Sequence, residues 1–120
     1  MLMETESTLP VLALVRDLMF SSRISATGRA AGIEVKVIRD PAQLAGQTGK
    51  LLLVDLNQAG AIEAASAWRE SGGGTVVGFV SHVDTATIQR ARDAKLDQVM
   101  ARSGFVEALP GLIEGAKRNA

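Results

Sequence analysis

The sequence predicts a single α/β domain, in which a five-stranded parallel sheet is covered by helices on both faces. Three observations lead to this fold class. Short runs rich in Val, Leu and Ile alternate with longer segments of helical periodicity along the 120-residue chain. Several of these runs are continuously apolar, as expected for parallel strands that are buried on both faces. Strands that alternate with helices also require crossover connections, and such connections produce a parallel sheet.

Five strands are expected, and the last of them is assigned mainly from its position after a helical segment. They lie at residues 11–15, 33–38, 51–55, 75–80 and 98–101. Five strands in a chain of this length suit the flavodoxin-like (βα)5 arrangement, a doubly wound sheet with strand order 2-1-3-4-5.

A helix is expected after each strand. Apolar side chains recur at three- or four-residue intervals in four segments, which contain Phe20 and Ile24, Ile62 and Trp68, Ile88 and Ala91, and Phe105 and Leu109.

The helix ends also carry recognisable signals. The run Asp40-Pro41-Ala42-Gln43 is typical of a helix start, with a capping carboxylate, a proline at the first position and a glutamine that can close a capping box. Asp84 and Ser103 are expected to cap the last two helices. Gly32 is expected to end the first helix, and the glycines at 72–74 the third.

Composition excludes several classes of function. Lys plus Arg number 13 and Asp plus Glu number 13, so the chain has no basic excess to attract nucleic acid. There is no cysteine and a single histidine, which excludes thiolate and multi-histidine metal sites. No apolar run reaches the roughly 20 residues that span a bilayer. We therefore expect a cytoplasmic protein without membrane contact, with a loose tail at residues 1–8 and one domain at residues 9–120.

Polar side chains follow four of the strands, where ligands bind in an open parallel sheet. Asp17 comes shortly after the first strand, Asp55 ends the third, Ser81 follows the fourth and Arg102 follows the fifth. Because these strands are consecutive in the predicted order, the four side chains should converge on one edge. Asp17 alone could equally be a helix cap, and Arg102 could be the ion-pair partner of a nearby aspartate.

Residues 51–60, LLLVDLNQAG, resemble the phosphoacceptor motif of bacterial response-regulator receiver domains. In that motif a strand-ending aspartate is followed, after two variable residues, by Met-Pro-Gly. The resemblance in element order extends from about Val11 to Ala116. It implies that Asp55 is the phosphoacceptor position, that Asp17 and Asp55 hold Mg²⁺, and that Ser81 and Arg102 contact the phosphoryl group.

The departures from the family pattern change the charge of this site. Receivers have two successive acidic residues after the first strand, whereas here the first is Arg16; they have a lysine where Arg102 stands, and an aromatic residue where Val99 stands. The charges of Asp17 and Asp55 are therefore balanced by Arg16 and Arg102. Opposite charges about 4 Å apart attract by roughly 4 kcal/mol at an effective dielectric near 20. We hypothesise that Arg102 or Arg16 pairs with Asp55 and that Mg²⁺ binding is weak, so that no cofactor is required.

The sequence thus favours a degenerate receiver domain of a two-component system, which acts in signal transduction through protein contact and is not an enzyme. Its partner would be a histidine kinase or an effector; because the proteins it resembles often dimerise, a homodimer is a further expectation. One alternative is a phosphorylation-competent receiver in a phosphorelay, with Asp55 as phosphoacceptor. Another is a small-molecule-binding or enzymatic domain of the same fold that uses His82 and Asp84. The candidate binding residues at this edge are Arg16, Asn57 and His82.

Overall fold

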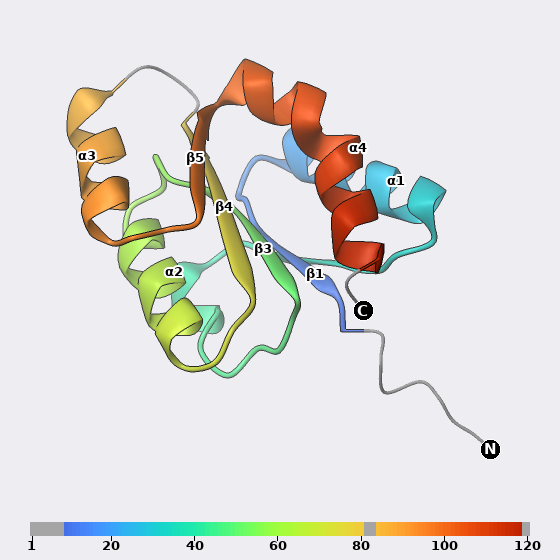
Figure 1. Cartoon of the computed structure of the whole chain (residues 1–120), viewed down its shortest axis with the longest axis horizontal. Helices are drawn as coiled ribbons and strands as arrows, with labels where there is room; N and C mark the ends of the chain where they lie inside the picture. The colour runs from blue at the N-terminus through green and yellow to red at the C-terminus, as the bar shows by residue number, and fades with distance from the viewer. Residues whose placement is uncertain (1–8, 81–83, 119–120) are drawn as a thin grey trace.

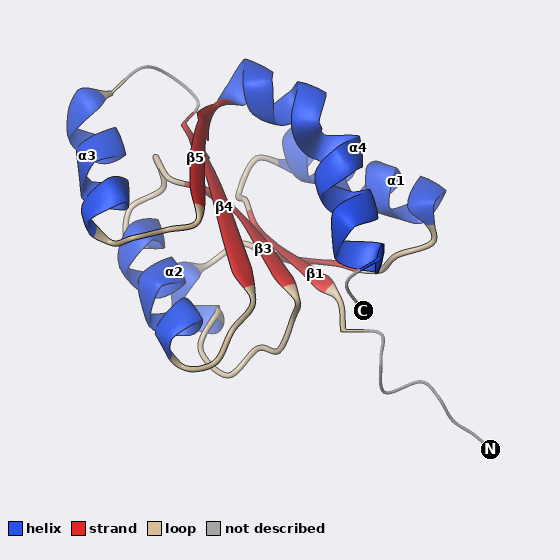
Figure 2. Cartoon of the chain, in the orientation of Figure 1, coloured by secondary structure: helices blue, strands red, loops and turns tan. Residues whose placement is uncertain are grey.

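The computed structural model describes residues 9–80 and 84–118, in which strands and helices alternate along the chain (Figure 1, Figure 2). The strands are β1 (Val11–Leu14), β2 (Val35–Ile38), β3 (Leu51–Asp55), β4 (Thr75–Val80) and β5 (Gln98–Ala101). The helices are α1 (Leu18–Ala31), α2 (Ala61–Glu70), α3 (Thr85–Asp93) and α4 (Arg102–Arg118). The tail expected at residues 1–8 lies outside the described residues. Within the described part of the chain, no helix is both long and apolar enough to cross a membrane.

The sheet is entirely parallel and has the order β2-β1-β3-β4-β5, which confirms the predicted topology. Val11 pairs with Val35 on one side and Leu51 on the other, and Leu51 pairs with Thr75. The carboxyl ends of all the strands therefore lie along one edge, where the sequence predicted the functional residues.

Helices cover both faces of the sheet, with α1 and α4 on one side and α2 and α3 on the other (Figure 1). The alternating side chains of β1 belong to different layers: Val11 and Ala13 pack toward α1 and α4, and Leu12 and Leu14 toward α2. All four side chains are fully buried. The continuous apolar run at this strand is thus the consequence of two buried faces.

The second of the five expected helices is not an α-helix. The segment that starts at Asp40 forms a single 3-10 turn, Pro41–Gln43, although Asp40 caps it as predicted by accepting a hydrogen bond from the amide of Ala42. The connection from β2 to β3 has only residues 39–50 with which to return across the sheet. At 1.5 Å per residue, a helix needs about ten residues to cover the roughly 15 Å length of a strand, which leaves too few for its turns.

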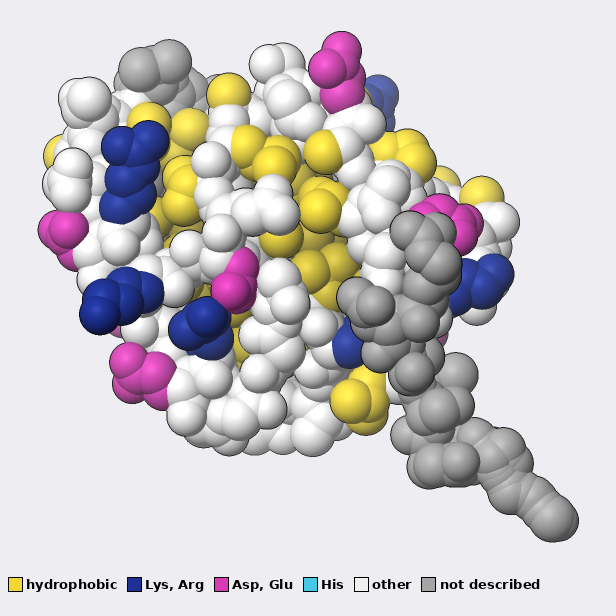
Figure 3. All heavy atoms as spheres, viewed as in Figure 1, with side chains coloured by type: hydrophobic (Ala, Val, Ile, Leu, Met, Phe, Trp, Pro, Cys, Tyr) yellow, Lys and Arg dark blue, Asp and Glu magenta, His cyan; other side chains and the backbone are white. Residues whose placement is uncertain are grey.

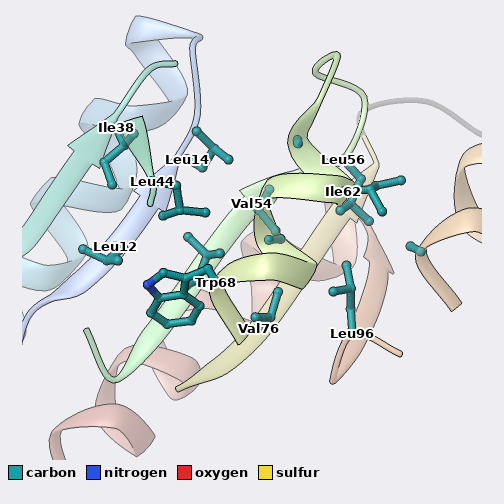
Figure 4. Close-up of a cluster of buried hydrophobic side chains, with 14 of the residues drawn as sticks. Leu12, Leu14, Ile38, Leu44, Val54, Leu56, Ile62, Trp68, Val76 and Leu96 are labelled. Carbon is teal, nitrogen blue, oxygen red and sulfur yellow. The ribbon is translucent and has the colours of Figure 1, made fainter. Parts of the chain in front are cut away.

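Trp68 of α2 fills the space beside this short connection. Its indole points from α2 toward Leu12 and Leu44 (Figure 4), and the residue is only 3% exposed. The indole Nε1 donates a hydrogen bond to the carbonyl of Gln47 at 2.8 Å, and the Gln47 side chain accepts one from Lys36 Nζ at 2.8 Å. The loop is therefore anchored on the face of the sheet that a second α-helix would otherwise cover.

Most of the predicted element ends are confirmed, with small exceptions. Gly32 ends α1 in the left-handed conformation at φ 75°, and Asp84 caps α3. The first strand ends one residue earlier than expected, and the second begins at Val35 because the amide of Ile33 still closes the end of α1. Ser103 is not a cap, since the chain turns directly from β5 into α4 at Arg102 and Ser103 is already helical.

Asp97 connects three elements at the amino edge of the sheet. Its carboxylate accepts two hydrogen bonds at 2.9 Å from the guanidinium of Arg69, at the end of α2, and one at 2.8 Å from the amide of Val76 in β4. These contacts, led by the bond from Arg69, lower the pKa of Asp97 below its ordinary value of 3.8. A partly exposed side chain is thus kept charged by its partners.

We expect Trp68→Ala to reduce the free energy of unfolding by about 3–5 kcal/mol, because it leaves a cavity. Trp68→Phe should cost about 1–2 kcal/mol, since it removes the bond to the Gln47 carbonyl. Urea unfolding followed by circular dichroism measures both. Glu70→Ala, an exposed change on the same helix, should stay within about 0.5 kcal/mol. A loss of less than about 1 kcal/mol for Trp68→Ala would show that the loop does not depend on the indole.

The free energy of unfolding should depend on pH because of Asp97. Because its pKa is lower in the folded than in the unfolded chain, its stabilisation is complete above the ordinary value of 3.8 and is lost as the pH falls through the folded-state pKa. We expect Asp97→Asn to lower the free energy of unfolding at pH 7 and to flatten its decline below about pH 4. The control is Asp93→Asn, which changes an exposed carboxylate on α3. An unchanged acid dependence in Asp97→Asn would contradict this role.

Candidate functional site

The candidate site lies at the carboxyl edge, where β1, β3 and β5 end. Asp17 follows β1 and precedes α1, Asp55 is the last residue of β3, and Arg102 is the first residue of α4. The strand order places β1 directly beside β3. Two of these predicted residues, Asp17 and Arg102, contact each other directly although they are far apart in sequence.

Asp17 has two roles at once. Its Oδ1 accepts a hydrogen bond from the amide of Phe20 at 3.1 Å, so that it caps α1, and its Oδ2 lies 3.8 Å from Nη2 of Arg102. The helix-cap interpretation and the ion-pair interpretation are therefore both correct. A carboxylate at a helix N-terminus is stabilised further by the helix dipole.

The guanidinium of Arg102 is held from a second direction by an aromatic ring. Its central carbon lies 4.1 Å from the ring centroid of Phe20, a distance at which a cation and a π-face attract. Phe20 packs on Phe79 at 5.0 Å between ring centroids, and Phe79 stacks on Phe105 at 4.5 Å. Arg102 thus rests on a buried aromatic cluster while its charged end faces Asp17.

This arrangement corrects one expectation and adds a residue. The sequence led us to expect that Arg102 or Arg16 pairs with Asp55, but the ion pair that the structure shows joins Arg102 to Asp17. The reason is Phe20, which supports the guanidinium beside the start of α1. Phe20 was not identified as a site residue because its spacing fits an ordinary core position. Its place three residues after the capping Asp17 was the available signal.

Asp55 is half-buried at the end of β3, and the following loop is built around it. The amide of Asn57 donates to Asp55 Oδ1 at 3.0 Å, and the amide of Gln58 donates to the Asp55 carbonyl at 3.3 Å. Gly60 then takes the left-handed conformation, at φ 81°, that begins α2. Asn57, predicted as a binding residue, is therefore a backbone partner of Asp55.

Arg16 lies next to Asp17 and is exposed. Its carbonyl accepts a hydrogen bond of 3.4 Å from Nη2 of Arg39, and the Arg39 carbonyl accepts one of 2.7 Å from Nε2 of Gln58. These two bonds join the ends of β1 and β2 to the loop after β3. Arg39 and Gln58 are further residues of this edge that the sequence did not single out.

The loop after β4 contains two predicted site residues, Ser81 and His82, which lie outside the described residues. Asp84, just after them, uses both carboxylate oxygens on Thr87: it accepts from the amide at 3.3 Å and from the hydroxyl at 2.6 Å. Asp84 is thus the cap of α3.

The residues present are a poor match to a magnesium site. A hard divalent cation prefers several free carboxylate oxygens. Asp17 already uses one oxygen on the Phe20 amide and has a guanidinium near the other. In residues 9–80 and 84–118, no cluster of three His, Cys, Asp or Glu side chains could hold a metal ion.

The fold and this edge define a doubly wound α/β domain with charged residues at the strand tips. No protein-family model matches the sequence, and no curated protein matches it. Solved structures do match. A response regulator from Thermotoga maritima has a TM-score of 0.72 and 14% identity, over 91% of this chain and 97% of that one. The phosphorylated cyanobacterial phytochrome response regulator RcpA has a TM-score of 0.77 and 14% identity, over 94% of this chain and 96% of that one.

An orphan response regulator of H. pylori is similar as well, with a TM-score of 0.72 and 13% identity, over 93% of this chain and 96% of that one. The chain therefore has the fold of response-regulator receiver domains over nearly its whole length, as the resemblance in the sequence predicted. Identities this low establish the fold, and the role of each site residue depends on the geometry above.

A double-mutant cycle isolates the contact between Asp17 and Arg102. Asp17→Asn keeps a capping oxygen but removes the charge, and Arg102→Gln removes the other charge. For a pair whose side chains are 50% and 39% exposed, we expect a coupling of about 0.2–1 kcal/mol in the free energy of unfolding. Asp17→Ala should cost about 1 kcal/mol more than Asp17→Asn, because it also removes the cap. Strictly additive single-variant effects would show that the two charges do not interact.

Proposed function

We propose that this chain is a receiver-type signalling domain that acts through contact with another protein, and that its phosphorylation is weakened. The observation that carries this proposal is the position of Arg102, which faces Asp17 at 3.8 Å and rests on Phe20. A lysine at the same place, as the resemblance implies, is a flexible point charge. Arginine is planar, always charged and well suited to hold a carboxylate.

This position of Arg102 acts against metal binding. A cation that approached Asp17 would have to displace the guanidinium or accept its repulsion. Like charges about 4 Å apart repel by roughly 4 kcal/mol at an effective dielectric near 20, and by less where water has access. We infer that magnesium binds weakly and that the domain does not require it for its fold or for partner binding.

The proposed partner surface has two parts. Leu18 and Met19, at the start of α1, are 63% and 85% exposed directly beside the Asp17–Arg102 pair. The second part is the face formed by α3, β5 and α4, which correspond to the fourth and fifth predicted helices and the strand between them. Val99 of β5 is half-buried there and lacks the large ring that could change position and signal a change at the site. A histidine kinase, an effector or a second copy of the chain would dock on these surfaces.

A specific observation also favours a second candidate, a competent phosphoacceptor. The Asn57 amide on Asp55 Oδ1 orients the carboxylate at the end of β3, where the receiver resemblance places the acceptor. Among the similar structures, one is a phosphorylated regulator and another is a receiver domain activated by BeF3. In this alternative, a carboxylate oxygen of Asp55 attacks the phosphorus of a phosphorylated donor, and the donor leaves.

Phosphorylation by acetyl phosphate, with magnesium present, distinguishes the two candidates. We expect intact-mass spectrometry to show little phosphorylated protein for the native chain and several-fold more for Arg102→Lys. This variant replaces the planar guanidinium with a flexible ammonium group. Asp55→Asn should show none in either background. Arg23→Lys, an exposed change on α1, is the matched control and should leave the native result unchanged.

The competent-receiver alternative predicts the opposite pattern. Extensive phosphorylation of the native chain, equal to that of Arg102→Lys and abolished by Asp55→Asn, would overturn the weakened-receiver proposal. It would also show that Arg102 substitutes fully for a lysine at this position.

A further inference from the structure

An open groove of about 410 Å³ runs between α1 and α4 on the outer surface of the molecule. In Figure 3, hydrophobic side chains are visible in the region where Figure 1 places α4 and α1. The groove exposes mainly alanine and proline side chains, which a partner can cover. Among the described residues, its lining consists of Ala26, Thr27, Ala30, Ala31, Pro110 and Glu114.

The two helices run side by side in the same direction (Figure 1). The ring of Phe20, near the start of α1, lies 5.8 Å from the ring of Phe105, near the start of α4. At the other end of the pair, Nζ of Lys117 donates a hydrogen bond of 3.0 Å to the carbonyl of Ala31. Each turn of α1 therefore has a turn of α4 at its own level along the groove.

The charges of the two helices are opposite. α1 contains Arg23 and Arg29 and no acidic residue, whereas residues 103–116 of α4 contain Glu107 and Glu114 and no basic residue. All four side chains are exposed, and none of them forms an ion pair with another described residue. Because the helices keep level, Arg23 lies at about the height of Glu107, and Arg29 at about the height of Glu114. This face thus carries both halves of a complementary charge pattern.

We propose that this face binds a second copy of the same chain, with α1 of each copy against α4 of the other. A two-fold axis along the groove produces this arrangement and keeps each pair of helices in the same direction. Arg23 of each copy then faces Glu107 of the other, and Arg29 faces Glu114. A two-fold axis across the groove would instead place the basic α1 on its own copy, which repulsion between like charges disfavours.

The apolar residues of the face suit a close contact between helices. Met19, which is 85% exposed, lies on the same side of α1 as Ala26 and Ala30, because their spacings of seven and four residues are close to whole turns. Pro110 is exposed within α4, although a proline inside a helix removes a backbone hydrogen bond. The small alanine side chains let a second helix approach, and Met19 and Pro110 add apolar area on either side.

This inference deepens the proposed function, because it names a partner for the surface at the start of α1. It requires neither magnesium nor phosphorylation of Asp55. A native chain that remains monomeric would therefore overturn this inference and leave the proposal of weakened phosphorylation in place.

Sedimentation equilibrium of the full chain, at concentrations up to about 1 mM, tests the proposal. We expect the native chain to dimerise. Arg23→Glu or Glu107→Arg alone should raise the dissociation constant at least tenfold, because each variant brings like charges together twice in one dimer. Arg92→Glu, the same reversal at an exposed position of α3, is the matched control and should change the constant by less than about twofold. Dissociation by Arg92→Glu and by neither of the other variants would place the interface elsewhere and overturn the proposal.

Mixing the two single variants tests the pairing itself. In a mixed dimer of Arg23→Glu with Glu107→Arg, the charges that face each other between the copies are opposite again. We therefore expect the mixture to dimerise at concentrations at which each variant alone is monomeric. The chain that carries both reversals should dimerise as well. Dimerisation of the doubly reversed chain without dimerisation of the mixture would overturn the proposal, because it would assign the charge pair to a single copy.

A change of size tests the groove without a change of charge. Ala26→Gln places a long polar side chain in the lining and should weaken dimerisation several-fold, because it separates the two helices. Ala67→Gln, the same change at an exposed alanine of α2, is the control and should have no effect. Equal dissociation constants for the two variants would contradict the close approach of a second copy at this groove.

Discussion

The properties of the carboxyl edge depend on one interaction, the contact of Arg102 with both Asp17 and Phe20. The ion pair alone, at 3.8 Å between partly exposed side chains, contributes little to stability. The ring of Phe20 adds a second support and joins the guanidinium to Phe79 and the buried cluster around it. The guanidinium of Arg102 is therefore held in one position, and the Asp17 carboxylate at the start of α1 has a fixed partner.

The parallel topology makes this contact available. Asp17 follows β1 and Arg102 follows β5, and β3 and β4 separate these two strands in the sheet. Because every strand runs in the same direction, the helices that follow β1 and β5 both begin at the carboxyl edge, which brings Asp17 and Arg102 together. α1 and α4, which begin at this edge, lie side by side over the same face (Figure 1). The fold is that of receiver domains, but the charges at its carboxyl edge are paired differently from what the family resemblance implies.

The fold could be predicted from the sequence because both faces of the sheet are buried, which makes the strands continuously apolar. In β1, Leu12 and Leu14 belong to one buried layer, and Val11 and Ala13 belong to the other. The 3-10 turn after β2 was missed because local capping signals do not report how much chain remains for the return across the sheet. At the site, the aspartates and Arg102 were identified from their places after strands. Phe20 was not, because a ring that supports an arginine has the same spacing as a ring that only packs.

The most direct measurement is the affinity of the chain for magnesium, by isothermal titration of the native protein and of Arg102→Gln. The account predicts binding weaker than millimolar in the native protein and a gain of about tenfold, equal to about 1.4 kcal/mol, when the guanidinium is removed. Millimolar or tighter binding by the native protein that Asp17→Asn abolishes would contradict it. That result would mean that the carboxylate beside Arg102 remains available to a cation.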